Sequence, residues 1–230
     1  MGTDFAVVGR LLSSPARAAM LEALLDGGTA SAGGLAAAAA VKPSTASGHL
    51  AALVEGGMVV VTTRGRNRDY RIADGDVALA LEALSRICPD LPVRSLRAAR
   101  RMDALRGART CYDHLAGQLG VGMLTALLQR EWLVANADDY LLTRVGARRL
   151  AGLGVDVSWA RRQRRNFARP CLDWTERRPH LAGALGAALC HTVVRGGWVR
   201  RRRSGRGLVI TPVGAVQLDQ AFGISMIATP

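Results

Sequence analysis

The chain has 230 residues and a formal net charge of +13, because 31 lysines and arginines outnumber 18 acidic residues. A hydrophobic fraction of 49% is sufficient for a globular core and excludes an intrinsically disordered chain. Chains of this length form one large domain or two small ones. The high positive charge indicates a polyanionic partner, either nucleic acid or an anionic membrane surface.

Several classes of protein are excluded by missing patterns. No run approaches the ~18 consecutive apolar residues of a membrane span, and residues 1–10 lack the layout of a signal peptide. We therefore expect a cytoplasmic protein with no membrane partner. The sequence has no CxxC pair, phosphate loop, HExxH or GxSxG motif, so an enzyme is not expected. In such a chain, cysteines are expected as thiols or ligands rather than disulfides; they are Cys88, Cys111, Cys171 and Cys190.

The positive charge is unevenly distributed along the chain. Residues 1–89 contain eight basic and eight acidic residues, whereas residues 90–230 contain 23 arginines and ten acidic residues. Pro89 and Pro92 interrupt any helix at the junction between these parts. We expect a DNA-binding domain over 1–89, a connecting and dimerisation helix over 90–110, and an effector and dimerisation region over 111–230.

The first part predicts a winged helix-turn-helix fold. Helices are expected over 13–26, with Ser14 as N-cap and Pro15 in the first turn, over 31–40 and over 43–55. Strands are expected over 58–63 and 69–72, around a basic turn at 64–68. In this fold one helix enters the major groove of duplex DNA and the hairpin contacts phosphates. The expected DNA contacts are Lys42, Ser44, Thr45, Ser47, His49, Arg64, Arg66 and Arg68.

Simpler roles are open for some of these side chains. The serines and the threonine of the third helix serve equally well as helix caps in any helical domain. His49 either contacts DNA or packs at the boundary between helix and core. No Cys, His or Asp lies three or four residues from His49, which argues against a metal ligand there.

Residues 5–85 resemble the ArsR/SmtB family of bacterial repressors. The resemblance lies in residues 14–17 (SPAR), 42–50 (KPSTASGHL), 57–59 (GMV) and 69–72 (DYRI). It implies a homodimeric, DNA-binding transcriptional regulator that a metal or another small effector releases from its operator. Metal-sensing members often carry cysteines in the first helix of the helix-turn-helix unit. This chain has Leu35 followed by five alanines there, so metal sensing is not implied by the resemblance.

The second part contains an internal duplication. His114-Leu115-Ala116-Gly117 recurs as His180-Leu181-Ala182-Gly183, and Thr143 and Trp132 have counterparts in Thr211 and Trp198. The copies span about 111–154 and 171–223. Each predicts a helix, a Trp-centred strand, a turn, a second strand and the start of another helix, which together are similar to half of a winged helix. The expected fold class is therefore mainly α with small β-wings (α+β).

Two further features of this part bear on function. A basic turn at 200–206 is expected to contact phosphate, chiefly through Arg201, Arg202 and Arg203. A single long helix is expected over 93–115, which would place Cys111 and His114 on one helix face.

Cysteine and histidine side chains of the two copies are candidate metal ligands. Cys111 and His114 have a spacing that suits Zn²⁺ or a thiophilic metal. Cys171, Asp173 or His180 would complete four ligands if the two copies face each other about a pseudo-twofold axis. The alternative is that both cysteines are small buried core residues. Trp132, Trp174 and Trp198 are expected either to line an effector pocket or to pack as ordinary core.

Together these patterns predict a transcriptional regulator, expected to be a repressor, that binds double-stranded DNA as a homodimer. Its DNA affinity is expected to respond to a small effector at the C-terminal region: a metal or metalloid ion, a thiol redox change or an organic ligand. One alternative is an architectural DNA-binding protein without effector sensing. A more distant alternative is an enzyme that pairs Cys111 with His114 or His180.

Overall fold

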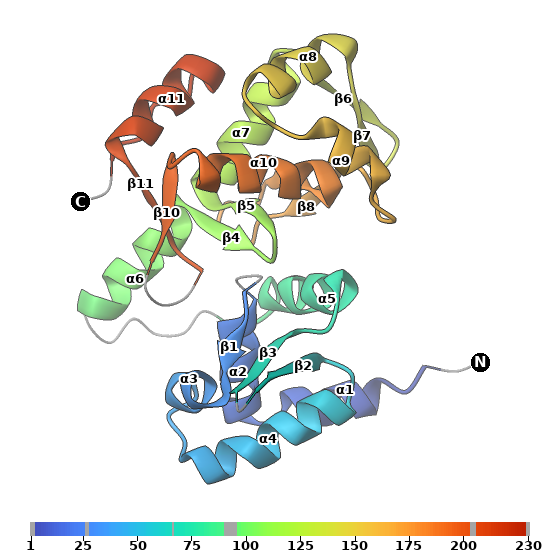
Figure 1. Ribbon diagram of the computed structural model, residues 1–230, viewed down its shortest axis with the longest axis vertical. Coiled ribbons are helices and arrows are strands. Elements are labelled where there is room, and N and C mark those ends of the chain that lie inside the picture. The colour runs from blue at the N-terminus through green and yellow to red at the C-terminus, as the bar shows by residue number, and fades with distance from the viewer. Residues whose placement is uncertain (1–2, 26–27, 66, 90–95, 203–205, 229–230) are drawn as a thin grey trace. The chain divides into compact units, whose positions relative to one another are not determined.

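The computed structural model describes residues 3–25, 28–65, 67–89, 96–202 and 206–228, without the side chains at 64, 67, 97, 98 and 101. The chain divides into two compact units, Met1–Cys88 and Pro89–Pro230, and each is described by itself (Figure 1). None of the helices formed by the described residues combines the length and apolar character that a membrane span requires.

The first unit is helical around a small sheet. The helices predicted over 13–26, 31–40 and 43–55 are confirmed as α2, α3 and α4. Ser14 caps α2 by accepting a hydrogen bond from the Arg17 amide, and Ser31 caps α3 in the same way from Gly34. The first and last helices of the unit were not predicted. The five are α1 (Phe5–Leu12), α2 (Pro15–Leu24), α3 (Ala32–Ala38), α4 (Pro43–Glu55) and α5 (Gly75–Ser85).

An antiparallel sheet completes the winged helix-turn-helix fold. Its order is β1-β3-β2, with bounds Ala30–Ser31 for β1, Val59–Arg64 for β2 and Asn67–Ile72 for β3. Strands β2 and β3 form the predicted hairpin, in register from Val59 opposite Ile72 to Arg64 opposite Asn67. Helices α2, α3 and α4 cover a core with buried side chains that include Met20, Leu21, Leu35, Leu50 and Leu53.

The second unit begins with helix α6 (Leu96–Gly107) and continues with the two predicted copies. The copies run from green to red in Figure 1 and have the same order of elements. A short helix, α9 (Val157–Arg162), lies between them in the chain. Copy one has β4 (Arg109–Cys111), β5 (His114–Ala116), α7 (Gly117–Gln129), β6 (Leu133–Asn136), β7 (Asp139–Leu142) and α8 (Arg144–Gly152). Copy two has β8 (Arg169–Leu172), β9 (Pro179–Ala182), α10 (Gly183–Arg195), β10 (Val199–Arg201), β11 (Leu208–Ile210) and α11 (Pro212–Phe222).

The two copies pack against each other through their central helices. Helix α7 contacts β9 of the second copy, and α10 contacts β5 of the first. A glycine at the same position of each helix permits this approach. A Cβ at Gly120 would lie 2.3 Å from the Leu115 carbonyl oxygen and 3.3 Å from the His180 Cβ. A Cβ at Gly186 would lie 2.4 Å from the Leu181 carbonyl oxygen and 3.3 Å from the His114 Cβ.

The predicted single helix over 93–115 is wrong. Helix α6 ends at Gly107, and the residues after it form the hairpin β4–β5. Cys111 and His114 are therefore cross-strand partners around a two-residue turn rather than neighbours on a helix face. All three residues of each strand are buried, so the alternation that identifies a half-buried strand is missing. The turn contains no glycine, although Tyr112 adopts a positive φ of 58°.

Candidate functional site

Helix α4 presents the polar side chains of its N-terminal half to solvent. Lys42 is the N-cap residue of the helix, and Lys42, Ser44, Thr45 and Ser47 are exposed. His49 is half-buried and lies at the edge between this surface and the core. The Ser47 hydroxyl donates a hydrogen bond to the Pro43 carbonyl at 3.1 Å, and this bond lies at the exposed surface of the helix. The opposite side of the helix packs into the core through Ala46, Leu50 and Leu53.

The wing beside this helix is described only in part. Arg68 on β3 is exposed. The Arg64 side chain and all of Arg66 lie outside the described residues.

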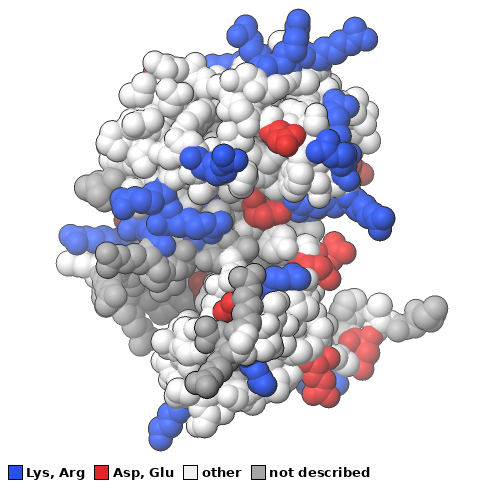
Figure 2. All heavy atoms as spheres, viewed as in Figure 1, with Lys and Arg blue, Asp and Glu red and all other residues white. Residues whose placement is uncertain are grey.

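The basic turn of the second copy is divided between surface and interior. Arg201 and Arg202 are exposed, and Arg203 lies outside the described residues. Arg206 is buried, and its carbonyl accepts a hydrogen bond from the Thr110 amide at 3.0 Å. Arg206 therefore belongs to the interior. The expectation that the whole turn contacts phosphate is wrong for this residue. In Figure 2, arginine side chains also gather over the α8 end of this unit.

The three tryptophans considered for an effector pocket lie in two different places. Trp132 and Trp198 are buried at equivalent positions of the two copies. Both meet Phe222 edge to face, with ring centroids 5.9 Å and 6.4 Å away. Trp174 lies elsewhere, with the Arg109 guanidinium 4.9 Å from its ring centroid. The structure therefore brings Trp132 and Trp198 together in the core, but not Trp174.

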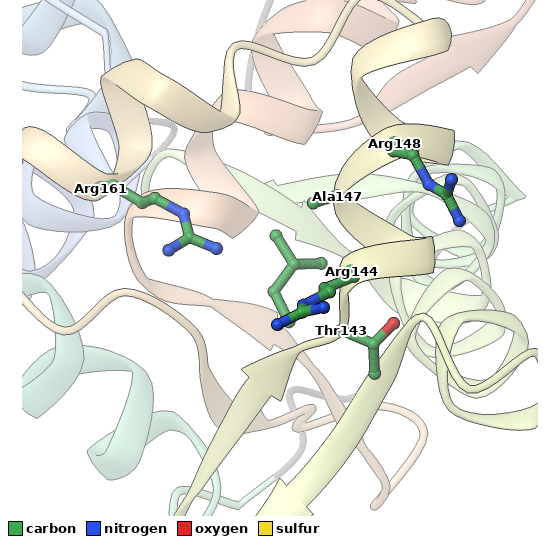
Figure 3. A pocket seen from close by; sticks show the side chains of 6 residues that line it. Thr143, Arg144, Ala147, Arg148 and Arg161 are labelled. Carbon is green, nitrogen blue, oxygen red and sulfur yellow. The ribbon is translucent and has the colours of Figure 1, made fainter.

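A surface pocket of about 530 Å³ lies between α8 and α9. Its lining includes Arg144, Arg148 and Arg161, and Figure 3 shows Arg144 and Arg161 extending toward it. Such a lining suits an anion. None of the residues predicted from the sequence as site residues belongs to this lining.

Two cysteines and two histidines converge where the copies meet. Cys111 and His114 come from the hairpin β4–β5, and Cys171 and His180 come from the hairpin β8–β9, where they are also cross-strand partners. One potential ligand atom from each side chain lies within 4.8 Å of those of the other three. The exposed fractions are 1% for Cys111, 3% for His114, 9% for Cys171 and 1% for His180. We call these four side chains the Cys/His cluster.

The sulfur and nitrogen atoms of the Cys/His cluster lie close together without a covalent bond between them. The two sulfur atoms are 3.9 Å apart, well beyond the ~2.05 Å of a disulfide bond. The two imidazole rings have centroids 5.1 Å apart. Neither Nε2 atom finds a hydrogen-bond partner among the described residues, although both are buried. A buried polar atom without a partner costs about 1–3 kcal/mol, and a ligand bound at Nε2 would remove this cost.

A carboxylate lies beside the other ring nitrogen of each histidine. His114 Nδ1 is 3.3 Å from Asp113 Oδ1, and His180 Nδ1 is 3.0 Å from Asp173 Oδ2. Each aspartate belongs to a Cys-x-Asp sequence, the first at 111–113 and the second at 171–173. The hydrogen bond with Asp113 orients the His114 ring with Nε2 directed away from the carboxylate. The contact of His180 with Asp173 is at ion-pair distance but lacks hydrogen-bond geometry.

Each aspartate is in turn held by an arginine from outside its own copy. Arg109 of copy one donates from Nη2 to Asp173 Oδ1 at 2.8 Å, and neither side chain is exposed. Arg165, which precedes β8 in the chain, is 2.6 Å from Asp113 Oδ2 through Nη1. This second pair is partly exposed. Arg109 therefore links the two copies, and Arg165 links copy one to the segment that leads into copy two.

The electrostatic environment favours the charged forms of one cysteine and one histidine of the cluster and of both aspartates. A hydrogen bond with Cys111 lowers the pKa of Cys171, and against the opposing effect of burial His114 and His180 lower it further. Burial alone would lower the pKa of His114, but Asp113 and Cys171 raise it above the ordinary value. Burial would raise the pKa of Asp173, but His180 and Arg109 outweigh it and hold the pKa below its usual range. Cys171 and His114 thus favour each other's charged forms.

Most residues of this site are predictable from the sequence, but the arginines that support it are not. Cys111, His114 and Cys171 were predicted as ligands, and His180 was one of two candidates for the fourth position. Arg109 and Arg165 were not identified. The repeated Cys-x-Asp and His-Leu-Ala-Gly sequences were the available signal for the cluster, because equivalent positions in a duplicated unit tend to meet near its axis. No sequence pattern distinguishes a buried arginine from a surface one.

Comparisons with known proteins identify relatives of both parts. A family described as "Helix-turn-helix domain" matches residues 12–62. The uncharacterized HTH-type transcriptional regulator YdfF of Bacillus subtilis (strain 168) is 39% identical over 226 residues, which are 98% of this chain and 100% of the relative. The HTH-type transcriptional regulator CmtR of Mycobacterium tuberculosis (strain ATCC 25618 / H37Rv) is 41% identical over 80 residues, which are 35% of this chain and 67% of the relative. The solution structure of the M. tuberculosis protein, described as a cadmium metal-sensor, is 38% identical with a TM-score of 0.32, covering 40% of this chain and 99% of that chain.

Proposed function

Because the chain belongs to the HTH-type transcriptional regulators and carries a winged helix-turn-helix unit of the ArsR/SmtB type, we propose that it is a homodimeric repressor. In this proposal the dimer occupies operator DNA until an effector binds the unit formed by residues 89–230. The exposed polar surface of α4, supported by a buried apolar side, is the observation that carries the proposal.

The side chains of α4 suit the reading of base edges. Ser44, Thr45 and Ser47 are short, exposed and able to donate and accept hydrogen bonds, and a helix bearing them fits the ~12 Å major groove. Lys42 and Arg68 add exposed positive charge, which suits phosphate contacts on either side of the groove. This division predicts sequence specificity from α4 and salt-dependent affinity from the basic residues.

Exposed apolar side chains of the first unit support dimerisation. Phe5 on α1 and Ile87 shortly after α5 are 81% and 79% exposed, and none of the eight described residues of α1 is buried. A second copy would cover such surfaces. A two-fold dimer also places two α4 helices on half-sites about one turn of DNA, ~34 Å, apart. The operator is therefore expected to be an inverted repeat.

The second unit is the proposed place of effector binding. The resemblance to the ArsR/SmtB family implies a metal site with cysteines in α3 for many metal-sensing members, but α3 of this chain has only alanine, glycine and leucine side chains. The Cys/His cluster supplies the reactive side chains that α3 lacks. A metal or metalloid ion, a redox change of the thiols and an organic ligand are the three effector classes considered.

The test is fluorescence anisotropy of the full chain with a labelled duplex from its own upstream region and a scrambled duplex of equal length. We expect tighter binding of the upstream duplex and a steep decrease of affinity with salt. A double Ser44→Ala, Thr45→Ala variant should bind the upstream duplex more weakly, by about 1–3 kcal/mol for each base that it no longer contacts. Its affinity for the scrambled duplex should not change. Ser85→Ala on α5 is the matched control. Equal affinity for both duplexes would instead support the architectural alternative.

The basic turn of the second copy has its own test. If it contacts phosphate, the triple variant Arg201→Gln, Arg202→Gln, Arg203→Gln should weaken binding to every duplex. It should also flatten the salt slope by about one unit for each phosphate that is no longer bound. An unchanged slope would mean that the positive charge of this turn does not contact DNA.

We further propose that the protein has no catalytic role. The thiol and imidazole groups of the Cys/His cluster are almost fully buried, which leaves a substrate no approach to them. A turnover that is measurable in the wild type and absent in Cys111→Ser would revive the enzyme alternative.

A further inference from the structure

The Cys/His cluster has the dimensions of a tetrahedral metal centre. In a tetrahedral site with metal–sulfur bonds of ~2.3 Å, two sulfur ligands lie about 3.8 Å apart, and Cys111 Sγ and Cys171 Sγ lie 3.9 Å apart. Four atoms that are mutually within 4.8 Å share a point at most about 2.9 Å from each. Small rotations of the rings therefore suffice to reach the ~2.0–2.3 Å of zinc–ligand bonds.

From this geometry we propose that Cys111, His114, Cys171 and His180 bind one zinc-class divalent cation, and that this ion is the effector of the proposed regulator. Two sulfur and two imidazole ligands suit Zn²⁺ or Cd²⁺, whereas Mg²⁺ and Ca²⁺ require oxygen ligands. All four ligands come from the protein and are buried, so the centre is closed to substrate water.

The orientation of the histidines is a second, independent sign of a ligand. His114 and His180 each have Nδ1 beside a carboxylate and a buried Nε2 that has no partner in the described part of the chain. Metal-bound histidines commonly have such a carboxylate, and the hydrogen bond with Asp113 fixes the tautomer that leaves Nε2 of His114 available to the ion. His180 Nδ1 lies 3.0 Å from Asp173 without hydrogen-bond geometry. A purely structural role for the rings explains the carboxylates but not the two unpartnered Nε2 atoms.

An ion at this position would connect the two copies to helix α6. His180 lies against Asp173, Asp173 accepts a hydrogen bond from Arg109, and Arg109 Nη1 donates to the Leu105 carbonyl at 3.0 Å. Leu105 belongs to the last turn of α6, the helix that follows the DNA-binding unit in the chain. An ion that holds the His180 side chain in place would therefore also restrict the last turn of α6, through Asp173 and Arg109. This regulatory part rests on the proposed function, whereas the metal centre itself does not.

Titration of the full-length, chelator-treated and reduced protein with Co²⁺ tests the metal centre. We expect saturation at one Co²⁺ per chain, the intense visible bands of a tetrahedral site, a thiolate charge-transfer band and displacement by Zn²⁺. The weak spectrum of hydrated Co²⁺ throughout the titration would overturn the proposal. So would a reduced protein that binds no metal but loses two hydrogens on mild oxidation through a Cys111–Cys171 disulfide.

Matched variants assign the ligands. Cys111→Ser and Cys171→Ser should each reduce the charge-transfer band by about half or more, because one of two thiolate ligands is lost, whereas Cys190→Ser, at another buried cysteine, should leave it unchanged. His114→Gln should weaken binding, and His191→Gln at an exposed histidine should not. Tryptophan fluorescence reports whether each variant is folded. If a ligand variant is unfolded, the wild-type spectrum and stoichiometry still decide the question.

Operator affinity of the metal-free and Zn²⁺-loaded protein tests the regulatory part. We expect the ion to change affinity at least about fivefold, the lower end of typical allosteric coupling. Metal binding with unchanged DNA affinity would overturn the effector role and leave the metal centre standing. Failure to bind any duplex in both states would overturn the proposed function, again without affecting the metal centre.

Discussion

The two aspartates of the Cys-x-Asp sequences are predicted to differ sharply in their contribution to stability. Asp173 and its partner Arg109 are completely buried. Asp173 also accepts hydrogen bonds from the Gly117 amide at 2.7 Å and the Thr175 hydroxyl at 2.7 Å. Asp113, at the equivalent position of copy one, has a side chain that is 30% exposed, and its partner Arg165 is 37% exposed. The duplication thus provides two similar ion pairs at different depths.

The expected magnitudes follow from burial. Asp173→Asn leaves the Arg109 guanidinium buried without a counter-charge, and breaking a buried pair in this way typically costs about 3–5 kcal/mol. Asp113→Asn removes a pair that water already screens, so a cost of about 1 kcal/mol or less is expected. With a urea m-value of about 2 kcal/mol/M, Asp173→Asn should lower the unfolding midpoint by about 2 M.

Urea unfolding followed by tryptophan fluorescence measures this difference selectively. All four tryptophans lie beyond residue 89, so the signal reports the second unit alone. A chelator is present throughout, which removes any contribution from bound metal. Equal midpoint shifts for the two variants, or a shift below about 0.5 M for Asp173→Asn, would refute the argument from burial.

Four other sites give independent predictions. Gly120→Ala should destabilise the second unit by about 1–3 kcal/mol because its Cβ meets backbone. Gly48→Ala, whose Cβ meets no described atom within 4 Å, should stabilise the first unit by about 0.5–1 kcal/mol in circular-dichroism melts. Thr211→Ala removes the N-cap of α11 and should cost about 1 kcal/mol, seen as a lower melting temperature. Burial raises the pKa of Cys190 to about 12, so iodoacetamide at pH 8 should label exposed Cys88 but not Cys190 until the chain unfolds. Since folding favours the protonated Cys190 thiol, its contribution to stability is complete below the ordinary thiol pKa of about 8.5 and is lost as pH rises toward 12. Cys190→Ala should therefore flatten the alkaline decline in unfolding free energy.

Local signals in the sequence were sufficient for most of the first unit. Helices α2, α3 and α4 begin at residues whose side chain or ring favours a helix start: Ser14 with Pro15, Ser31 and Pro43. The wing was predicted because its strands are rich in β-branched residues around a polar turn. Helices α1 and α5 were missed. Helix α1 buries none of its described residues, so its apolar side chains give no sign of a packed face within one chain.

The sequence by itself determined the winged helix-turn-helix unit, the duplication and the candidate cysteines, because each depends on spacing within a short stretch. Only the tertiary structure decided that Cys111 and His114 face Cys171 and His180. These side chains meet only because two short hairpins, one with three-residue strands and one with four-residue strands, come together although they lie about 60 residues apart in the chain. Their approach also depends on close packing at Gly120 and Gly186. The structure likewise showed that Arg109 and Arg206 are buried, although a charge count treats every arginine alike. Burial depends on contacts between distant segments, and no local pattern records it.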